Sequence, residues 1–282
     1  MNAPLLPTPH VEPFFFDVEP GTRFSLYHAP APHMPSRGAI LFVHPLAEEL
    51  NHSRRMASLQ ARRFAALGFT VLQIDLFGCG DSCGDFSSAR WEQWLRDLTV
   101  AADWLAERDN GPMQLWGLRL GALLALDFAR ARQIDGLILW QPILNGRNCV
   151  NQFLRQRLGA DLRRGVPLAE RCTVALRERM EAHGTIEVNG YEMSAQLARA
   201  IDERDARTMQ PPPCPIHWFA SGTPAPTRLA RVVTRLAARW AGYGATVHFH
   251  PITGIPFWNR PDLPECPALI EATTAVFHPS TP

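Results

Sequence analysis

Residues 113–126 read MQLWGLRLGALLAL, in which an apolar run is followed by two spaced glycines and a second apolar run. The first run is typical of a buried strand, and residues 118–131 have the periodicity of a helix. Gly117 and Gly121 flank Arg119 by two positions on each side. This is the frame of a nucleophile elbow, G-x-S-x-G, a sharp turn between a strand and a helix. The segment therefore predicts an α/β fold built around this turn.

The central residue of that frame is an arginine, Arg119, where the motif has a serine. A guanidinium has five hydrogen-bond donors and no acceptor, and it keeps its proton at any ordinary pH. It cannot attack a carbonyl carbon. The sequence therefore predicts the shape of the elbow without its usual chemistry.

Strands and helices alternate on both sides of the elbow, as βαβ units with a mostly parallel sheet require. The predicted strands are Phe14–Val18, Phe24–His28, Ala39–His44, Thr70–Leu76, Met113–Trp116, Gly136–Trp140, Ile216–Ala220 and Thr246–His250. The predicted helices lie at about 53–67, 89–107, 118–131, 226–241 and 266–277. Ligands bind at the carboxyl ends of such strands, so functional residues are expected in the turns that follow them.

The alternation stops at residues 145–210, where the sequence predicts helices but no strand. We interpret this stretch as a helical cap inserted into the sheet domain. The expected organisation is a first part of the core at 1–144, a cap at 145–213 and a second part of the core at 214–282. Eight arginines lie between Gly146 and Arg179, and they are expected to form a solvated helical face or to steer an acidic substrate or partner.

Several stretches together resemble the α/β-hydrolase fold and, within it, the family called exosortase A system-associated hydrolase 2. The resemblance covers most of residues 39–275 and is carried by HPLAEELNHSRRM (44–56), IDLFGCGDSCGDFSSARWEQW (74–94), LWGLRLGALLAL (115–126), LWQPILNGRNCVNQFLRQRL (139–158) and GIPFWNRPDLPECPALIEAT (254–273). It implies an eight-stranded, mostly parallel sheet with a helical cap, and a bacterial hydrolase associated with protein sorting and exopolysaccharide production. It also implies that the arginine at the elbow belongs to the family pattern.

The other two members of a Ser-His-Asp triad are missing from the places where this fold carries them. The histidine belongs on the loop after the last strand, but residues 253–258 read TGIPFW. The acid belongs after the strand at 216–220, and no Asp or Glu occurs from Pro211 to Asn259. The sequence therefore predicts that the ordinary triad mechanism does not operate.

Other catalytic groups can be considered. The strand that ends at His44 is expected to have two neighbours in the sheet. One precedes the loop with Cys79 and Cys83, and the other precedes Arg119. A catalytic dyad of His44 and a cysteine is therefore conceivable. The favoured alternative is that residues 78–84 form a structural turn, with Asp81 and Ser82 bonding to its backbone. His248 and His250 share one strand face, as metal ligands can, but no third ligand motif accompanies them, so we expect no metal site.

Arg119 places a full positive charge at the amino end of a helix, where the helix already favours an anion. Either an acid compensates it, with Glu48, Glu49 and Asp81 as candidates, or a bound carboxylate or phosphate does. The backbone N–H groups of Leu120 and Leu46 would complete an anion pocket. Trp258 would line that pocket.

Composition limits the binding partners, the cellular location and the cofactors that can be expected. The 282 residues carry a formal net charge of +1, which gives no general attraction to nucleic acid or to an anionic membrane. No apolar run is long enough to span a membrane, and the first thirty residues lack the pattern of a signal peptide, so a cytoplasmic location is expected. The six cysteines suggest neither a disulfide framework nor a zinc site. No cofactor is expected.

Two functional hypotheses remain open. The first is a divergent ester hydrolase or acyl-transfer enzyme of the exosortase A and exopolysaccharide system that uses residues outside the usual triad. The second is a non-catalytic pseudoenzyme that binds a small anionic ligand, or a protein partner from that system, through Arg119. The residues favour the second hypothesis, whereas the resemblance favours the first.

Overall fold

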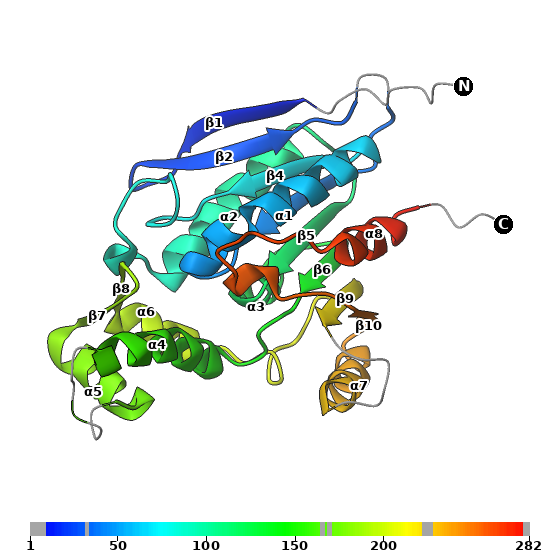
Figure 1. Cartoon of the computed structure of the whole chain (residues 1–282). Coiled ribbons are helices and arrows are strands. Elements are labelled where there is room, and N and C mark those ends of the chain that lie inside the picture. Colours follow the sequence, from blue (N-terminus) through cyan, green and yellow to red (C-terminus); the bar gives the residue numbers. More distant parts are fainter. Residues whose placement is uncertain (1–9, 32–33, 164–166, 168–170, 222–227, 279–282) are drawn as a thin grey trace.

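The computed structural model describes residues 10–31, 34–163, 167, 171–221 and 228–278 (Figure 1). Its strands are β1 (Val11–Asp17), β2 (Thr22–His28), β3 (Ala39–Val43), β4 (Thr70–Ile74), β5 (Met113–Leu118), β6 (Gly136–Trp140), β7 (Thr185–Val188), β8 (Tyr191–Ser194), β9 (Pro215–Ser221) and β10 (Thr246–Ile252). Its helices are α1 (Glu48–Ala66), η1 (Phe86–Ser88), α2 (Trp91–Ala106), α3 (Leu120–Phe128), α4 (Gly146–Arg163), α5 (Thr173–His183), α6 (Ala195–Asp202), α7 (Arg228–Ala241), η3 (Phe257–Asn259) and α8 (Pro267–Ala275).

Eight strands form one sheet in the order β1-β2-β4-β3-β5-β6-β9-β10. The first three strands pair antiparallel and the rest pair parallel, which confirms the expected mostly parallel eight-stranded sheet. Every residue of β3 is buried, as expected of a strand covered on both faces. Val43 at the end of β3 pairs with Gly117 of β5, so the loop after β3 lies beside the elbow.

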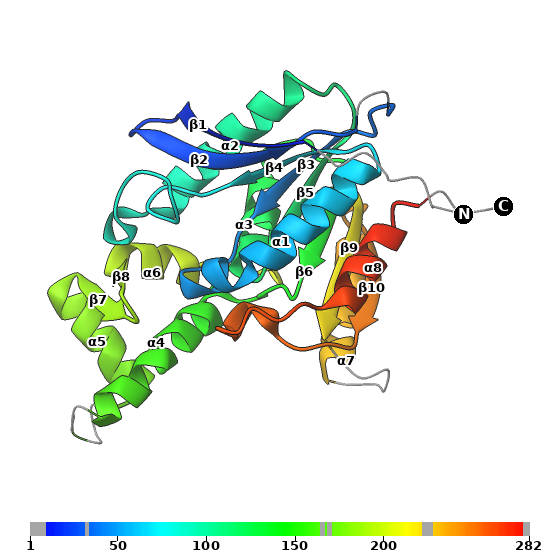
Figure 2. The same cartoon turned by 45° about the horizontal axis from the view of Figure 1, so that its top comes forward.

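Helices cover both faces of the sheet and bury two apolar cores. On one face α1 and α8 lie side by side (Figure 2) and pack against Phe42, Trp116 and Trp140. On the other face α2 and α3 pack over the central strands, which contribute Leu41 and Leu115 to the second core, and α7 packs against β10. Because the strands between these layers are buried on both sides, the sheet holds the loops at its carboxyl ends in fixed positions.

Helices α4, α5 and α6 lie beyond the carboxyl ends of the parallel strands (Figure 1). The prediction that residues 145–210 contain no strand was wrong, because β7 and β8 form an antiparallel hairpin there. Its turn is Asn189-Gly190, and both residues have positive φ angles, of 52° and 86°. An Asn-Gly pair is a strong hairpin signal, but the four-residue strands beside it are too short to show a clear alternation.

Helix α1 begins at Glu48, five residues before the predicted start at Ser53. Ala47 precedes it with a φ angle of 50°, and the first turn carries two acids, Glu48 and Glu49. Acidic side chains are favourable there because they complement the partial positive charge of the helix terminus. The earlier start matters for the site, because it places Glu49 beside the elbow.

None of the described helices is both long enough and apolar enough to cross a membrane.

Candidate functional site

The elbow has the tight geometry that its two glycines predict. A Cβ atom at Gly117 would lie 2.4 Å from the Cα atom of Ala122, and one at Gly121 would lie 2.1 Å from the carbonyl oxygen of Val43. Arg119 sits between them with φ 56° and ψ −115°, a region that non-glycine residues seldom adopt. Strain of this kind persists at sites where the surrounding structure enforces it. The turn therefore presents one side chain at the carboxyl end of β5.

The side chain of Arg119 joins three separate segments. Its Nε atom donates to Oε1 of Glu49 in the first turn of α1 at 3.2 Å. Its Nη2 atom donates to Oε1 of Gln152 in α4 at 2.8 Å. Its Cζ atom also lies 5.3 Å from the ring centre of Trp258, in η3, which is within cation–π range. The arginine is thus held by an acid, an amide and an aromatic ring.

Glu49 is the acid that compensates Arg119. Burial raises the pKa of Glu49, and the neighbouring Arg119 opposes that rise. Its second carboxylate oxygen, Oε2, is buried and has no hydrogen-bond partner among the described residues. Glu48 instead lies 3.6 Å from Nε2 of His52, one turn further along α1, and Nδ1 of His52 is 3.2 Å from the carbonyl oxygen of Trp258.

The space beside the elbow is very small. Leu46 and Leu120 line a cavity of about 10 Å³ together with His44 and Cys79. A second cavity, of about 20 Å³, is bounded by Leu46, Glu48, Glu49 and Gln152 among others. A single water molecule needs about 10–15 Å³ of such volume. In this conformation the site therefore has room for a water molecule beside Leu120, but an ester group does not fit there.

His44 and Cys79 line the same small cavity, but no hydrogen bond joins His44 to a thiol among the described residues. Its Nδ1 atom lies 2.7 Å from the carbonyl oxygen of Pro45, and its Nε2 atom accepts a hydrogen bond from the N–H of Leu76 at 3.2 Å. Burial lowers the pKa of this imidazole, which favours its neutral form. Because both ring nitrogens are engaged by the backbone, the ring connects the ends of β3 and β4.

The two cysteines of the loop after β4 lie in different surroundings. Cys79 is buried beside the elbow, and burial raises the pKa of its thiol well above the usual range. Cys83 lies at the turn between β1 and β2, where its Sγ atom donates to the carbonyl oxygen of Pro20 at 3.1 Å. Asp81 does not reach Arg119, and its own N–H donates to the carboxylate of Asp75 at 3.0 Å. Of these three residues, only Cys79 lies at the elbow.

His248 and His250 lie on β10 next to His217 of β9. The rings of His217 and His248 stack with centres 4.9 Å apart, and Nδ1 of His217 is 3.2 Å from Nε2 of His250. Within the described part of the chain, no group of three or more His, Cys, Asp or Glu side chains has a geometry that could hold a metal ion.

Two residues of the site were missed in the sequence. Gln152 lies in α4, 33 residues from Arg119, and no motif marks it. Only the folding of α4 across the carboxyl ends of the strands brings it to the guanidinium. His52 had a detectable signal, because it follows Glu48 by four residues and therefore shares one face of a helix with it.

Comparison with known proteins agrees with this fold. The family model described as serine aminopeptidase, S33 (Hydrolase_4) matches residues 34–200. The human protein ABHD12B is 26% identical over 169 residues, which are 51% of this chain and 45% of that protein, so the chain spans less than half of this relative's length.

Among solved structures, Est1E from Butyrivibrio proteoclasticus with bound ferulic acid has a TM-score of 0.64 at 15% identity, covering 94% of this chain and 96% of that one. A thermostable carboxyl esterase from Bacillus coagulans has a TM-score of 0.61 at 17% identity, covering 94% and 97% of the two chains. These two likenesses show the α/β-hydrolase fold. The family match extends over more than half of the chain and includes β3, the elbow and most of the segment that follows β6. The chain belongs to the serine aminopeptidase S33 (Hydrolase_4) family of the α/β-hydrolase superfamily.

Proposed function

We propose that this protein is a non-catalytic member of its family that binds an anionic ligand through Arg119. The observation that carries the proposal is the arrangement of this guanidinium at the position of the nucleophile. Two of its five N–H groups make hydrogen bonds, to Glu49 and Gln152, and the other three make none among the described residues. A partly neutralised guanidinium with a free edge is suited to a carboxylate or a phosphate group.

The backbone around Arg119 favours the same kind of ligand. Leu120 is the first residue of α3, and first-turn N–H groups have no acceptor within their own helix. Leu46, in the loop after β3, faces the same small cavity as Leu120. In this fold the oxyanion-hole donors are the N–H of the residue after the nucleophile and an N–H from the loop after β3, which supports the choice of Leu120 and Leu46. Without an attacking group, such donors still stabilise a bound anion.

The bound state requires one rearrangement. The cavities beside the elbow have volumes of only about 10 and 20 Å³, so an anion must displace a neighbouring group. Gln152 is neutral, whereas a carboxylate or phosphate oxygen is a stronger acceptor for a guanidinium. We infer that the ligand replaces Gln152 on Arg119, and that residues 145–213 act as a cap which yields at α4. Either a small anion or an acidic side chain of an exosortase-system partner satisfies this chemistry.

A second candidate function is ester hydrolysis or acyl transfer in the exosortase A and exopolysaccharide system. It is supported by the family match over residues 34–200 and by the resemblance of the quoted motifs to the exosortase-associated family. An ester substrate is consistent with the carboxyl esterase from Bacillus coagulans having this fold. This candidate requires a nucleophile outside the elbow.

Two measurements separate the candidates. The protein is incubated with 4-nitrophenyl butyrate and with a fluorophosphonate probe, and it is expected to show no turnover above background and no labelling. Thermal unfolding is then followed with inorganic phosphate and with butyrate. We expect either anion to raise the Tm of the wild type and to leave the Tm of Arg119→Met unchanged.

Arg132→Met is the matched control. Arg132 is also a partly exposed arginine paired with an acid, Asp103, but it precedes β6 and so lies at the opposite ends of the strands. Its variant should retain the anion-dependent rise in Tm. Ester turnover by the wild type would refute the binding proposal, and so would an equal response to anions in the Arg119→Met variant.

A further inference from the structure

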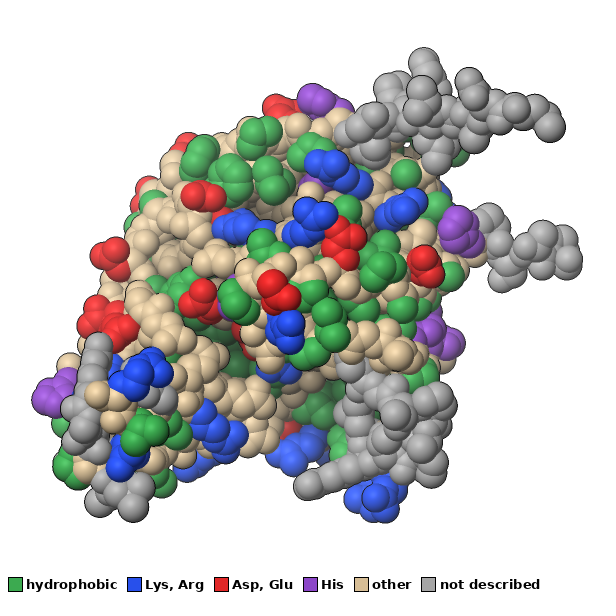
Figure 3. Space-filling model, in the orientation of Figure 1, with side chains coloured by type: hydrophobic (Ala, Val, Ile, Leu, Met, Phe, Trp, Pro, Cys, Tyr) green, Lys and Arg blue, Asp and Glu red, His purple; other side chains and the backbone are tan. Residues whose placement is uncertain are grey.

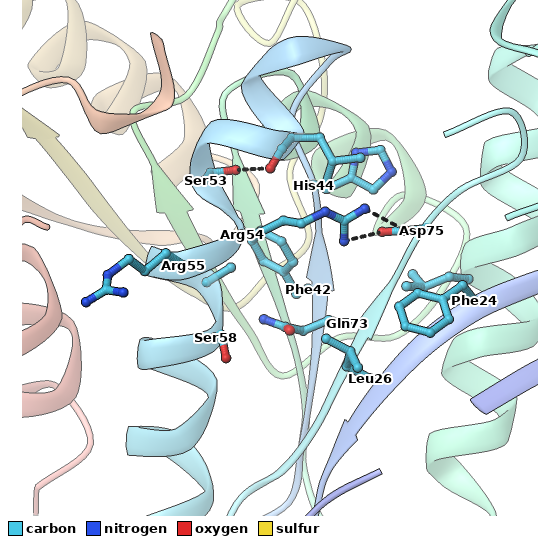
Figure 4. A pocket seen from close by; sticks show the side chains of 13 residues that line it. Phe24, Leu26, Phe42, His44, Ser53, Arg54, Arg55, Ser58, Gln73 and Asp75 are labelled. Carbon is cyan, nitrogen blue, oxygen red and sulfur yellow. Dashed lines mark hydrogen bonds and ion pairs between the residues drawn. The ribbon is translucent and has the colours of Figure 1, made fainter. Parts of the chain in front are cut away.

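A cavity of about 290 Å³ lies between α1 and the antiparallel edge of the sheet (Figure 4). Phe24 and Leu26 of β2 and Phe42 of β3 provide apolar walls, and Leu50 and Ala57 of α1 close the cavity on the helix side. Neither Arg119 nor its partners Glu49, Gln152 and Trp258 line it. His44 is the one residue that it shares with the small cavity at the elbow, so the two spaces are neighbours with otherwise different walls.

The cavity exists because small side chains of α1 face β2. Side chains alternate along a strand, so Phe24 and Leu26 point to the face of the sheet that carries α1. The helix presents Ser53, Ala57 and Ser58 to them, and these side chains are too short to fill the space. The space is open to solvent on one side, because Phe24 and Leu26 are only half-buried. Apolar walls in contact with water are stabilised when a hydrocarbon ligand covers them.

Every charged group that lines the cavity already has a partner. Arg54 donates to both carboxylate oxygens of Asp75, at 3.2 and 2.8 Å, and Figure 4 shows this pair among the side chains that line the cavity. Arg55 pairs with Glu265 outside the cavity. At the elbow, free N–H groups at the start of α3 stand beside Arg119, whereas Arg54 and Arg55 lie inside α1, where the backbone N–H groups bond within the helix. A charged ligand in this cavity would therefore exchange its hydration for mainly apolar walls, which is costly. The occupant is therefore uncharged.

The remaining polar groups allow a weakly polar end on the occupant. Both nitrogens of His44 are used by the backbone, and the hydroxyl of Ser53 donates to the carbonyl oxygen of Glu49. Gln73 is different, because its Oε1 atom is 3.4 Å from Nε2 of His28 while its Nε2 atom is buried without a partner among the described residues. A hydroxyl or carbonyl oxygen would satisfy this amide once it turns toward the cavity.

We propose that this cavity binds an uncharged, mainly hydrocarbon ligand of about ten carbon atoms, such as a medium-chain alcohol or an acyl chain. An apolar cavity of about 150 Å³ holds one benzene molecule, so 290 Å³ takes a chain of roughly twice that size. Phe15 of β1 packs edge-on against Phe24, with ring centres 5.4 Å apart, and is 57% exposed. Figure 3 shows hydrophobic side chains gathered over β1 and β2, where such a ligand would approach.

The proposal is tested with a series of linear alcohols from butan-1-ol to hexadecan-1-ol, titrated into the full chain by calorimetry. Each added methylene is expected to tighten binding about fourfold until the cavity is full at about ten carbons. Decanoate is expected to bind at least tenfold more weakly than decan-1-ol, because its charge has no partner in the cavity. Affinity that keeps rising through hexadecan-1-ol would indicate adsorption to the surface and would overturn the proposal.

Two substitutions narrow the cavity from opposite sides, namely Ser58→Leu on α1 and Leu26→Trp on β2. Each is expected to weaken decan-1-ol binding at least tenfold. Ser88→Leu, at an exposed position outside the cavity, should bind as the wild type does. Tight binding by both narrowed variants would overturn the proposal. The proposal would also be overturned if the wild type were a dimer in solution and decan-1-ol dissociated it. In that case a second copy of the chain would be the natural occupant of the cavity.

Discussion

The Nε atom of Arg119 lies 3.2 Å from Oε1 of Glu49, and the two residues are 70 positions apart in the chain. The side chains are only 16% and 17% exposed, so neither charge is well solvated. The pair links the elbow after β5 to the first turn of α1, and Gln152 extends the link to α4. A cation at the position of the nucleophile is thus built into the packing of the fold.

A double-mutant cycle measures this link. Glu49→Gln and Arg119→Met should each lower the free energy of unfolding, because each leaves a poorly solvated partner without its opposite charge. The loss in the free energy of unfolding of the double variant should be about 1–3 kcal/mol smaller than the sum of the two single losses. Urea denaturation provides the values. The same cycle between Glu49→Gln and Arg132→Met serves as the control and should be additive within about 0.5 kcal/mol. Additivity in the Arg119 cycle would contradict the link.

A serine placed at the centre of the elbow should not by itself produce esterase activity. Arg119→Ser is expected to show no turnover of 4-nitrophenyl butyrate, because no histidine stands on the loop after β10 and both nitrogens of His44 are engaged by the backbone. A serine hydroxyl without a general base is a weak nucleophile. Stopped assays over several hours at high enzyme concentration provide the measurement. A clear gain of turnover would mean that another base, such as His52, reaches the elbow.

The cysteines should differ sharply in reactivity. Cys79 and Cys149 are buried, and burial raises the pKa of each thiol, whereas Cys172 is exposed. The thiolate is the reactive form, so an aromatic disulfide reagent should modify Cys172 in the native protein and should reach Cys79 and Cys149 only after unfolding. Mass spectrometry of the labelled peptides identifies the sites. Faster native labelling of Cys79 than of Cys172 would instead revive a catalytic thiol at the elbow.

The elbow glycines should tolerate no side chain. A Cβ atom at Gly121 would lie 2.1 Å from the backbone oxygen of Val43, so Gly121→Ala must displace β3 or α3. The expected loss is about 3 kcal/mol in the free energy of unfolding, at the upper end of the usual cost of overpacking. Gly136→Ala is the matched control, because its Cβ would first meet the flexible side chain of Gln114 at 3.3 Å. Chemical denaturation compares the two, and similar losses in both variants would contradict the elbow packing.

The sequence by itself determined the sheet and the elbow. Alternating apolar strands and amphipathic helices fix an α/β architecture, because each element has only one way to bury its apolar face. The spacing of Gly117 and Gly121 around Arg119 predicted the turn, since only glycine allows the close approach of Ala122 and Val43. These features depend on residues near one another in the chain, so they can be predicted from the sequence alone.

Only the tertiary structure decided what surrounds the arginine and where space remains. Three acids were candidate partners, and the early start of α1 selects Glu49, while Gln152 arrives from a helix that no motif connects to the elbow. The cavity beside β2 likewise depends on how α1 lies over the sheet, which places short side chains opposite Phe24 and Leu26. Such contacts join residues far apart in the chain, and their geometry is set by packing between elements, which local patterns do not encode.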